Sequence, residues 1–271
     1  MPEKYIRRNG IPLLVRHTGR TTLPQDPPHR GTGPAILCLH DAGLQSSVFI
    51  ELFAALSSDS WALAFDLPGH GRSGGLDALP SIEKMAELAG WVAGWCRAQR
   101  PILVGHGMGA LLALEWARKE PESVAGLILC GVGLALRISD HTIETMRQVT
   151  RGKAPRPFDP SRVAKDSGPD LMKRAYLEGM RTDPRATLVD LEASRDWSNA
   201  FHPIDDGPSV LCPTRIVGGS AESRDSLERA GALADSLSQA SVVRVEGAAH
   251  FLPLEKPEAL AKEIRLIAEA V

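Results

Sequence analysis

The stretch PILVGHGMGA, residues 101–110, carries the strongest structural signal in the sequence. Its first residues are apolar, and a short unbroken run of this kind is typical of a strand buried on both faces of a parallel sheet. Three glycines follow, and from Met108 onward apolar residues recur at helical spacing. This succession of strand, tight turn and helix is the context of the nucleophile elbow G-x-S-x-G. The central residue here is Gly107, so the sequence predicts an elbow without an oxygen nucleophile.

The same alternation extends along the chain in both directions. Short apolar runs predict strands at residues 35–39, 61–65, 124–130, 214–217 and 241–245. Apolar residues at three- and four-residue spacing predict helices over residues 46–57, 81–97, 108–118, 227–236 and 257–270. Near the N-terminus, two further strand-like runs flank Asn9-Gly10, which is a strong hairpin turn signal. Strands that alternate with helices indicate a mainly parallel α/β sheet with right-handed crossovers.

One segment interrupts this alternation. Residues 134–205 contain several helix-like pieces, many prolines and arginines, and no clear strand. We therefore expect an α/β core formed by residues 1–133 and 206–271, with residues 134–205 as a helical cap. An insertion of this kind is a good candidate for a lid over a functional site.

Composition narrows the possible function classes. The 31 Lys and Arg are balanced by 33 Asp and Glu, so the net charge of −2 offers no basic footprint for nucleic acid. Four widely spaced cysteines predict reduced, packed thiols rather than disulfides or a zinc site. No signal peptide is expected, and no apolar run reaches the about 20 residues that cross a bilayer. We expect a cytoplasmic protein without a membrane segment, bound metal or organic cofactor.

Four motifs resemble those of the α/β-hydrolase superfamily, in its cap-bearing branch of esterases, lactonases and C–C hydrolases. LHDAG at residues 39–43 resembles the H-G-x-G loop, and DLPGHGRS at 66–73 resembles the D-x-P-G-x-G-x-S loop. GHGMG at 105–109 resembles the G-H-S-M-G elbow, and GAAH at 247–250 resembles the motif of the catalytic histidine. The resemblance covers nearly the whole core and implies an α/β-hydrolase fold with a helical cap.

Two of the three catalytic triad positions depart from the pattern of that family. Gly107 replaces the serine, and Ala221 stands where the resemblance implies an aspartate. His250 is retained, and either Glu222 or Asp225 is a possible acid partner for it, with solvated loop carboxylates as the alternative. Because the serine hydroxyl is missing, acyl-enzyme chemistry at this position is impossible.

The resemblance also assigns the remaining parts of the site. It places the oxyanion hole at the backbone N–H groups of Ala42 and Met108, which do not depend on the serine side chain. Asp41 replaces a loop glycine; it could repel an anion or act as a base, but a turn-stabilising role is favoured. For His106, packing or a loop hydrogen bond is favoured over ligand binding. A second match to G-x-S-x-G, centred on Ser73, lies inside the D-x-P-G loop and is interpreted as structural.

Three hypotheses for function remain. The first is an enzyme in which His250 acts as a general base on water or substrate. The second is a binding or regulatory protein that has lost catalysis. The third is that glycine was engineered in place of a serine at position 107, which would not explain why Ala221 stands where an aspartate is expected. The retained histidine slightly favours the enzyme, and the expected partner is a small organic ester or carbonyl compound bound beneath the cap.

Overall fold

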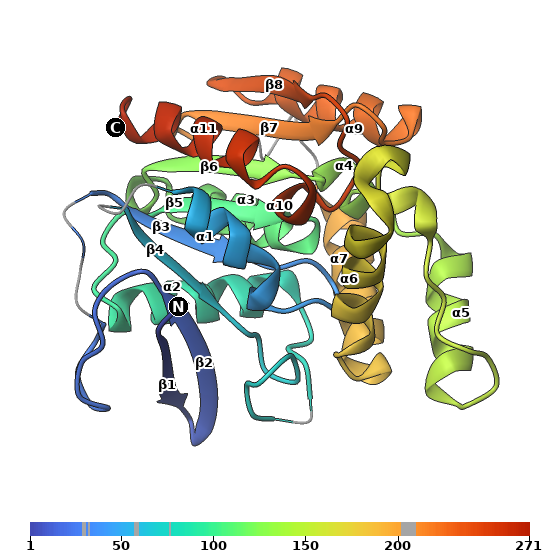
Figure 1. Cartoon of the computed structure of the whole chain (residues 1–271), viewed down its shortest axis with the longest axis horizontal. Helices are drawn as coiled ribbons and strands as arrows, with labels where there is room; N and C mark the ends of the chain where they lie inside the picture. Colours follow the sequence, from blue (N-terminus) through green and yellow to red (C-terminus); the bar gives the residue numbers. More distant parts are fainter. Residues whose placement is uncertain (29–30, 32, 57–59, 76, 202–209) are drawn as a thin grey trace.

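The fold is built around a central sheet (Figure 1). The computed structural model describes residues 1–28, 31, 33–56, 60–75, 77–201 and 210–271. The eight strands of the sheet have the order β1-β2-β4-β3-β5-β6-β7-β8. β2 pairs antiparallel with β1 and β4, and the pairs from β4 through β8 are parallel. This arrangement confirms the predicted α/β class. The strands are β1 (Glu3–Arg8), β2 (Ile11–His17), β3 (Ala35–Leu39), β4 (Trp61–Phe65), β5 (Ile102–His106), β6 (Gly126–Cys130), β7 (Thr214–Gly219) and β8 (Ala240–Val245).

The predicted hairpin forms the edge of this sheet. Asn9 and Gly10 have φ angles of 51° and 82°, and they join β1 to β2. A two-residue turn with positive φ at both positions matches the twist of the strands that it connects, which explains why Asn-Gly occupies it.

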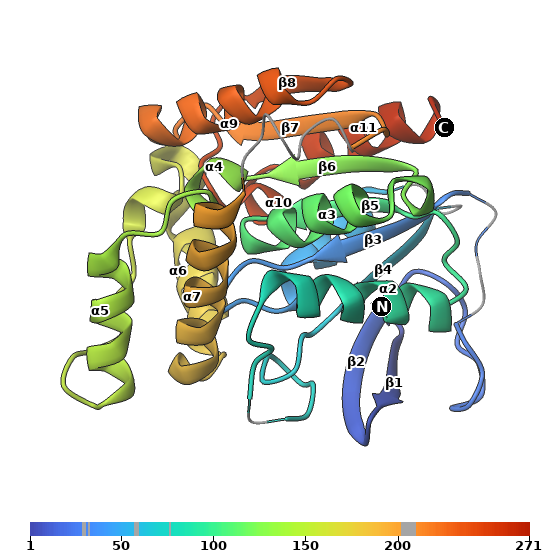
Figure 2. The same ribbon diagram turned by 180° about the vertical axis from the view of Figure 1, so that it is seen from behind.

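The buried strands supply two separate cores, one on each face of the sheet. Leu37, Leu63 and Leu103 belong to one cluster, whereas their neighbours Ile36 and Ile102 belong to the other. Helices α2, α3 and α9 cover the first face, and α1 and α11 cover the second (Figures 1 and 2). The helices around the sheet are α1 (Ile50–Ala55), α2 (Ile82–Trp95), α3 (Met108–Lys119), α9 (Arg224–Ser236), α10 (Leu252–Glu255) and α11 (Pro257–Ala268), with the 3-10 turns η1 (Ser46–Phe49) and η2 (Pro121–Ser123).

Between β6 and β7, the described residues form helices and loops but no strand. Figure 1 shows α5, α6 and α7 side by side beyond the arrowheads of β6 and β7. The expected boundary between residues 205 and 206 lies outside the described residues. The segment contains α4 (Val132–Ala135), α5 (Asp140–Thr150), η3 (Pro160–Arg162), η4 (Lys165–Ser167), α6 (Gly168–Met180) and α7 (Pro184–Ala200). No helix in the described ranges combines the length and the apolar character needed to cross a membrane.

Two buried carboxylates attach this helical segment to the core. Asp190 of α7 accepts hydrogen bonds from the Gly43 N–H (2.8 Å) and from His70 Nε2 (2.7 Å). Glu178 of α6 accepts one from the Ser47 hydroxyl at 2.6 Å and another from the Gln45 amide. The four donors lie in the segments that directly follow β3 and β4, so both helices are held above the carboxyl ends of these strands.

Candidate functional site

The elbow requires small residues because the backbone on either side of it is closely packed. β5 runs on to His106, beyond the predicted strand end, and α3 begins at Met108. Gly107 between them has a φ angle of 53°, a conformation that side-chain-bearing residues rarely adopt. A Cβ at Gly109 would collide with the carbonyl oxygen of Leu39. The strand, the turn and the helix therefore meet as the sequence predicts, with Gly107 at the apex.

The Asp41 carboxylate occupies the space where an elbow side chain would stand. A Cβ added at Gly107 would collide with this carboxylate. Asp41 Oδ1 accepts hydrogen bonds from the backbone N–H groups of Ala42 and Met108, each at 2.8 Å. The two predicted oxyanion-hole donors therefore do converge on one oxygen atom, but this oxygen belongs to the protein. The sequence favoured a turn-stabilising role for Asp41, in which its side chain accepts from the N–H two residues further on. That N–H, of Gly43, donates to Asp190 instead.

The second carboxylate oxygen of Asp41 joins two further groups. His250 Nε2 and Arg162 Nη2 each lie 2.8 Å from Asp41 Oδ2. His250 follows β8, and Arg162 ends η3 in the helical segment; the Arg162 carbonyl also accepts from the His250 N–H at 3.0 Å. The Asp41 side chain is only 7% exposed. Because a buried charge needs partners, the two backbone N–H groups, the imidazole and the guanidinium that donate to it stabilise its carboxylate. Arg162 carries no motif, and sequence reasoning missed it.

These contacts determine the protonation states of Asp41 and His250. Burial alone would raise the pKa of Asp41, but the His250 hydrogen bond and the Arg162 charge hold it well below its usual range. Burial and the Arg162 charge lower the pKa of His250 to about 3 despite the nearby carboxylate. Near neutral pH, the pair is therefore an ionised Asp41 that accepts from a neutral His250. A general base works best with a pKa near the working pH, and these contacts shift the pKa of both groups downward, away from it.

The other ring nitrogen of His250 lies on the side where a triad acid would be expected. His250 Nδ1 is buried and has no hydrogen-bond partner in the described part of the chain. A Cβ added at Gly131, directly after β6, would lie 2.8 Å from this atom. A side chain at this position would thus reach the histidine, but glycine offers none.

Glu222, the possible acid, makes other hydrogen bonds. Its carboxylate accepts from the Gly219 N–H (3.0 Å) and from the Ser226 hydroxyl (2.7 Å), and burial raises its pKa. Asp225, the alternative, pairs with Arg229 one helical turn further along α9. No hydrogen bond joins either carboxylate to His250 within the described ranges. The carboxylate partner of His250 is Asp41, on the opposite ring nitrogen from the one that a triad acid would contact.

His106 lies against this cluster through a loop hydrogen bond. Its Nε2 donates to the His250 carbonyl at 2.8 Å, and its Nδ1 is buried without a partner among the described residues. Asp41, His106 and His250 together offer ligand atoms within 4.8 Å of one another, a set of two imidazoles and one carboxylate that suits transition metals. A cation would have to displace the Arg162 guanidinium from Asp41, so the arrangement fits a hydrogen-bonded cluster better than a metal site.

Ser73, the centre of the second G-x-S-x-G match, supports the loop on which it lies. Its hydroxyl donates to the Asp66 carbonyl at 2.6 Å and accepts from the Leu14 N–H at 2.9 Å. The first contact closes the loop after β4 on itself and the second attaches it to the neighbouring β2, which agrees with a structural role.

A cavity of about 370 Å³ opens above Asp41 and His250. This volume lies in the range of small-molecule sites. The helical segment supplies most of its wall, and the loop after β3 supplies the remainder together with Phe251. Its apolar lining includes Leu134, Ile138, Met146, Phe158, Met180 and Leu191.

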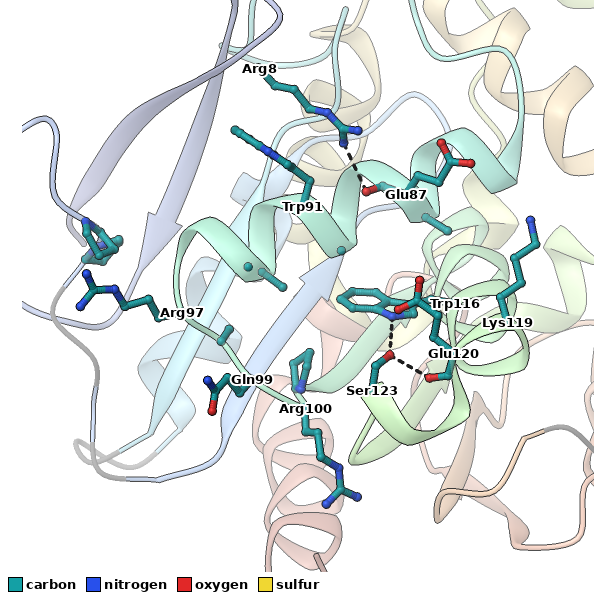
Figure 3. Close-up of a pocket in the computed structure, with 18 of the residues that line it drawn as sticks. Arg8, Glu87, Trp91, Arg97, Gln99, Arg100, Trp116, Lys119, Glu120 and Ser123 are labelled. Carbon is teal, nitrogen blue, oxygen red and sulfur yellow. Dashed lines mark hydrogen bonds between the residues drawn. The ribbon is translucent and has the colours of Figure 1, made fainter.

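A larger depression of about 1190 Å³ lies elsewhere, over α2 and the end of α3. Figure 3 shows Trp91 and Trp116 among its charged and polar lining residues. None of the candidate site residues lines it, so the cavity above Asp41 is the candidate functional site.

Sequence and structure comparisons identify the relatives of this chain. Pimeloyl-[acyl-carrier protein] methyl ester esterase from Chromobacterium violaceum is 35% identical over 102 residues, which are 36% of this chain and 37% of that protein. The matched segment thus spans little more than a third of this relative's length. Monoacylglycerol lipase ABHD6 from Bos taurus is 22% identical over 284 residues, covering 97% of this chain and 80% of that protein.

Solved structures support the fold. A thermophilic esterase from Thermogutta terrifontis has a TM-score of 0.80 at 23% identity, covering 100% of this chain and 99% of that one. An enol-lactonase from Burkholderia xenovorans LB400 has a TM-score of 0.76 at 19% identity, covering 98% and 99%. The sequence profile of the alpha/beta hydrolase family matches residues 36–263. Because this match covers most of the sequence, the chain belongs to the α/β-hydrolase family.

Proposed function

We propose that this protein binds a small organic ester or carbonyl compound in the cavity above Asp41 and His250, without serine-type turnover. The observation that carries the proposal is the position of the Asp41 carboxylate, which lies in the place of the missing nucleophile and accepts from the Ala42 and Met108 N–H groups. The cavity remains lined by apolar side chains from the helical segment, which are suited to a small organic ligand.

Two independent losses weigh against ester hydrolysis. An acyl-enzyme requires a nucleophilic oxygen at position 107, where glycine stands. The tetrahedral intermediate requires free oxyanion-hole donors, and removing one such donor costs about a hundred- to a thousandfold in turnover. Here both donors are bound to Asp41 Oδ1, so a ligand carbonyl cannot be polarised at that point.

Filling the cavity tests the proposal. Gly179 lines the cavity, whereas Gly231 in α9 lies outside its lining; nothing lies within 4 Å of a Cβ added at either residue. We expect Gly179→Phe to weaken binding of methyl 6-oxoheptanoate at least roughly tenfold in calorimetry, since the ring occupies ligand space. Gly231→Phe is the matched control and should bind like the wild type.

Two results would contradict this proposal. Equal binding by wild type and Gly179→Phe would place the ligand outside the cavity. Hydrolysis of the methyl ester by the wild type, lost in His250→Ala, would show turnover where we expect only binding.

The position of Asp41 Oδ2 favours a second candidate function, hydrolysis through an aspartyl ester. Carboxylates act as covalent nucleophiles in some hydrolases. Attack of Oδ2 on a saturated carbon would form an alkyl ester and expel the leaving group with its bonding electron pair. Water would then add to Cγ, placing the oxyanion on Oδ1 beside the Ala42 and Met108 N–H groups. Collapse would release the alcohol and one proton and regenerate the carboxylate.

Intact-mass spectrometry tests this second function. After incubation with 1-bromobutane, we expect the wild type to gain the mass of one butyl group on Asp41, and Asp41→Asn to gain none. Asp159→Asn, which removes another cavity-lining carboxylate, is the matched control and should still be labelled. An unlabelled wild type that also releases neither bromide nor 1-butanol, or a label on a peptide without Asp41, would exclude the aspartyl ester.

A further inference from the structure

Arg156 places a cation in the cavity wall without a carboxylate partner. Its Nη2 donates to the Thr187 hydroxyl at 2.8 Å, and its Nη1 donates to the Thr182 carbonyl. No ion pair joins Arg156 to an acidic side chain within the described ranges, in contrast to Arg162, which pairs with Asp41. Since a guanidinium carries five N–H donors, three remain for a ligand after these two bonds.

The guanidinium of Arg156 lies next to the loop that carries the oxyanion-hole donor Ala42. A Cβ added at Gly43 would approach Arg156 Nη2 to 3.2 Å and Thr187 Oγ1 to 2.6 Å. Gly43 also lines the cavity. Arg156 therefore lies on the side of the cavity that is formed by the loop after β3, within the space where a ligand would bind.

The charges around the cavity favour an anion. Three arginines line the cavity, at positions 137, 156 and 162, against two carboxylates, those of Asp41 and Asp159. Arg162 compensates Asp41. Arg137, an exposed lining residue, adds a further positive charge. Half-burial of Arg156 makes its unpaired charge costly, and burial lowers its pKa despite the charge of Asp183. A ligand anion would relieve this cost.

We infer that the ligand of this cavity carries a carboxylate that pairs with Arg156, with an apolar body against the helical segment. The planar fork of a guanidinium matches the two oxygens of one carboxylate, which makes a small organic acid the best fit. This inference rests on the proposed function, because it assumes that the cavity is the ligand site.

Binding of three matched compounds tests the inference. 6-Oxoheptanoate, its primary amide and its methyl ester share one carbon skeleton, and only the first is charged at pH 7. We expect the wild type to bind the acid roughly ten- to a hundredfold more tightly than the amide, as for a hydrogen bond to a charged group. Arg156→Gln should reduce this ratio to near one, mainly by weakening the binding of the acid. Arg151→Gln, an exposed arginine outside the cavity lining, should keep the ratio.

The outcomes separate this inference from the proposed function. If the wild type binds acid, amide and ester alike, the carboxylate preference is wrong and the cavity proposal stands. If none of the three compounds binds, both are wrong. If Arg156→Gln keeps the full preference, another cation recognises the acid and the assignment to Arg156 is overturned. If Arg156→Gln loses all three compounds, Arg156→Lys decides: restored binding with a preference for the acid supports the inference, and equal binding of acid and amide rejects it.

Discussion

Replacing Gly107 by serine alone will leave ester hydrolysis at the wild-type level, whereas the double change Gly107→Ser and Asp41→Gly will raise it by about a hundredfold. The factor follows from serine proteases. Loss of the whole triad lowers their turnover number about 10⁶-fold, and loss of the acid alone lowers it about 10⁴-fold. The double variant would hold a serine and His250 but no triad acid, so it should recover the ratio of these two losses, about a hundredfold.

The single variant fails for two structural reasons. The Cβ of the new serine would collide with the Asp41 carboxylate, and this carboxylate would still occupy the Ala42 and Met108 N–H groups. The positive φ of Gly107 strains a side-chain-bearing residue by about 1–3 kcal/mol, a cost that both variants share. Asp41→Gly removes the collision and frees the Ala42 and Met108 N–H groups. Arg162 then loses its carboxylate partner, but it is partly exposed and can bind water.

Hydrolysis of p-nitrophenyl butyrate, followed by absorbance, is the measurement. Asp41→Gly alone is the matched control, because it opens the hole without adding a nucleophile and should remain inactive. Adding His250→Ala to the double variant should abolish the gain. Activity in Gly107→Ser alone would mean that Asp41 moves aside easily, contrary to its four hydrogen bonds. An inactive double variant would show that His250 is not positioned to activate a serine.

The fold was predictable because its signals are local. Each buried strand is a short apolar run, and the hairpin depends on the two residues Asn9 and Gly10. The elbow glycines follow from backbone contacts between adjacent elements, such as Gly109 against Leu39. Signals of this kind lie within a few residues of the structure they specify, and a single sequence therefore contains them.

The chemistry of the site was less predictable because it depends on contacts between distant residues. Asp41 and Gly107 each depart from the family pattern, and the structure shows that one fills the space left by the other. The sequence contained a signal for this, since the resemblance places both departures at one oxyanion hole. Arg162 offered no such signal, because it is one arginine among many in a segment without a motif. Glu222 lies near the expected position in sequence, but its hydrogen bonds to Gly219 and Ser226 direct it away from His250.

Asp190→Ala will lower the free energy of unfolding by about 3–5 kcal/mol, the cost of removing one partner from a buried charge pair. The side chains of Asp190 and His70 are both 0% exposed. His70 donates from Nε2 to Asp190 and from Nδ1 to the Pro68 carbonyl, which requires a protonated ring. Removing Asp190 would leave this cation and the Gly43 N–H without their acceptor. Asp196→Ala, at a 70% exposed position on the same helix, is the matched control and should cost less than about 0.5 kcal/mol.

The dependence of this loss on pH identifies the charged form of His70. Burial opposes the protonated ring, but the charge and the hydrogen bond of Asp190 outweigh it and raise the pKa of His70 above its ordinary value of 6.5. A raised folded-state pKa contributes stability that is fully present below 6.5 and is lost as pH rises through the folded value. Urea unfolding at a series of pH values should therefore show the largest gap between wild type and Asp190→Ala below pH 6.5, and a shrinking gap above the raised pKa. If the difference in unfolding free energy widens with rising pH, His70 is neutral. If the difference is no larger than for Asp196→Ala, the Asp190 carboxylate does not anchor α7 to the core.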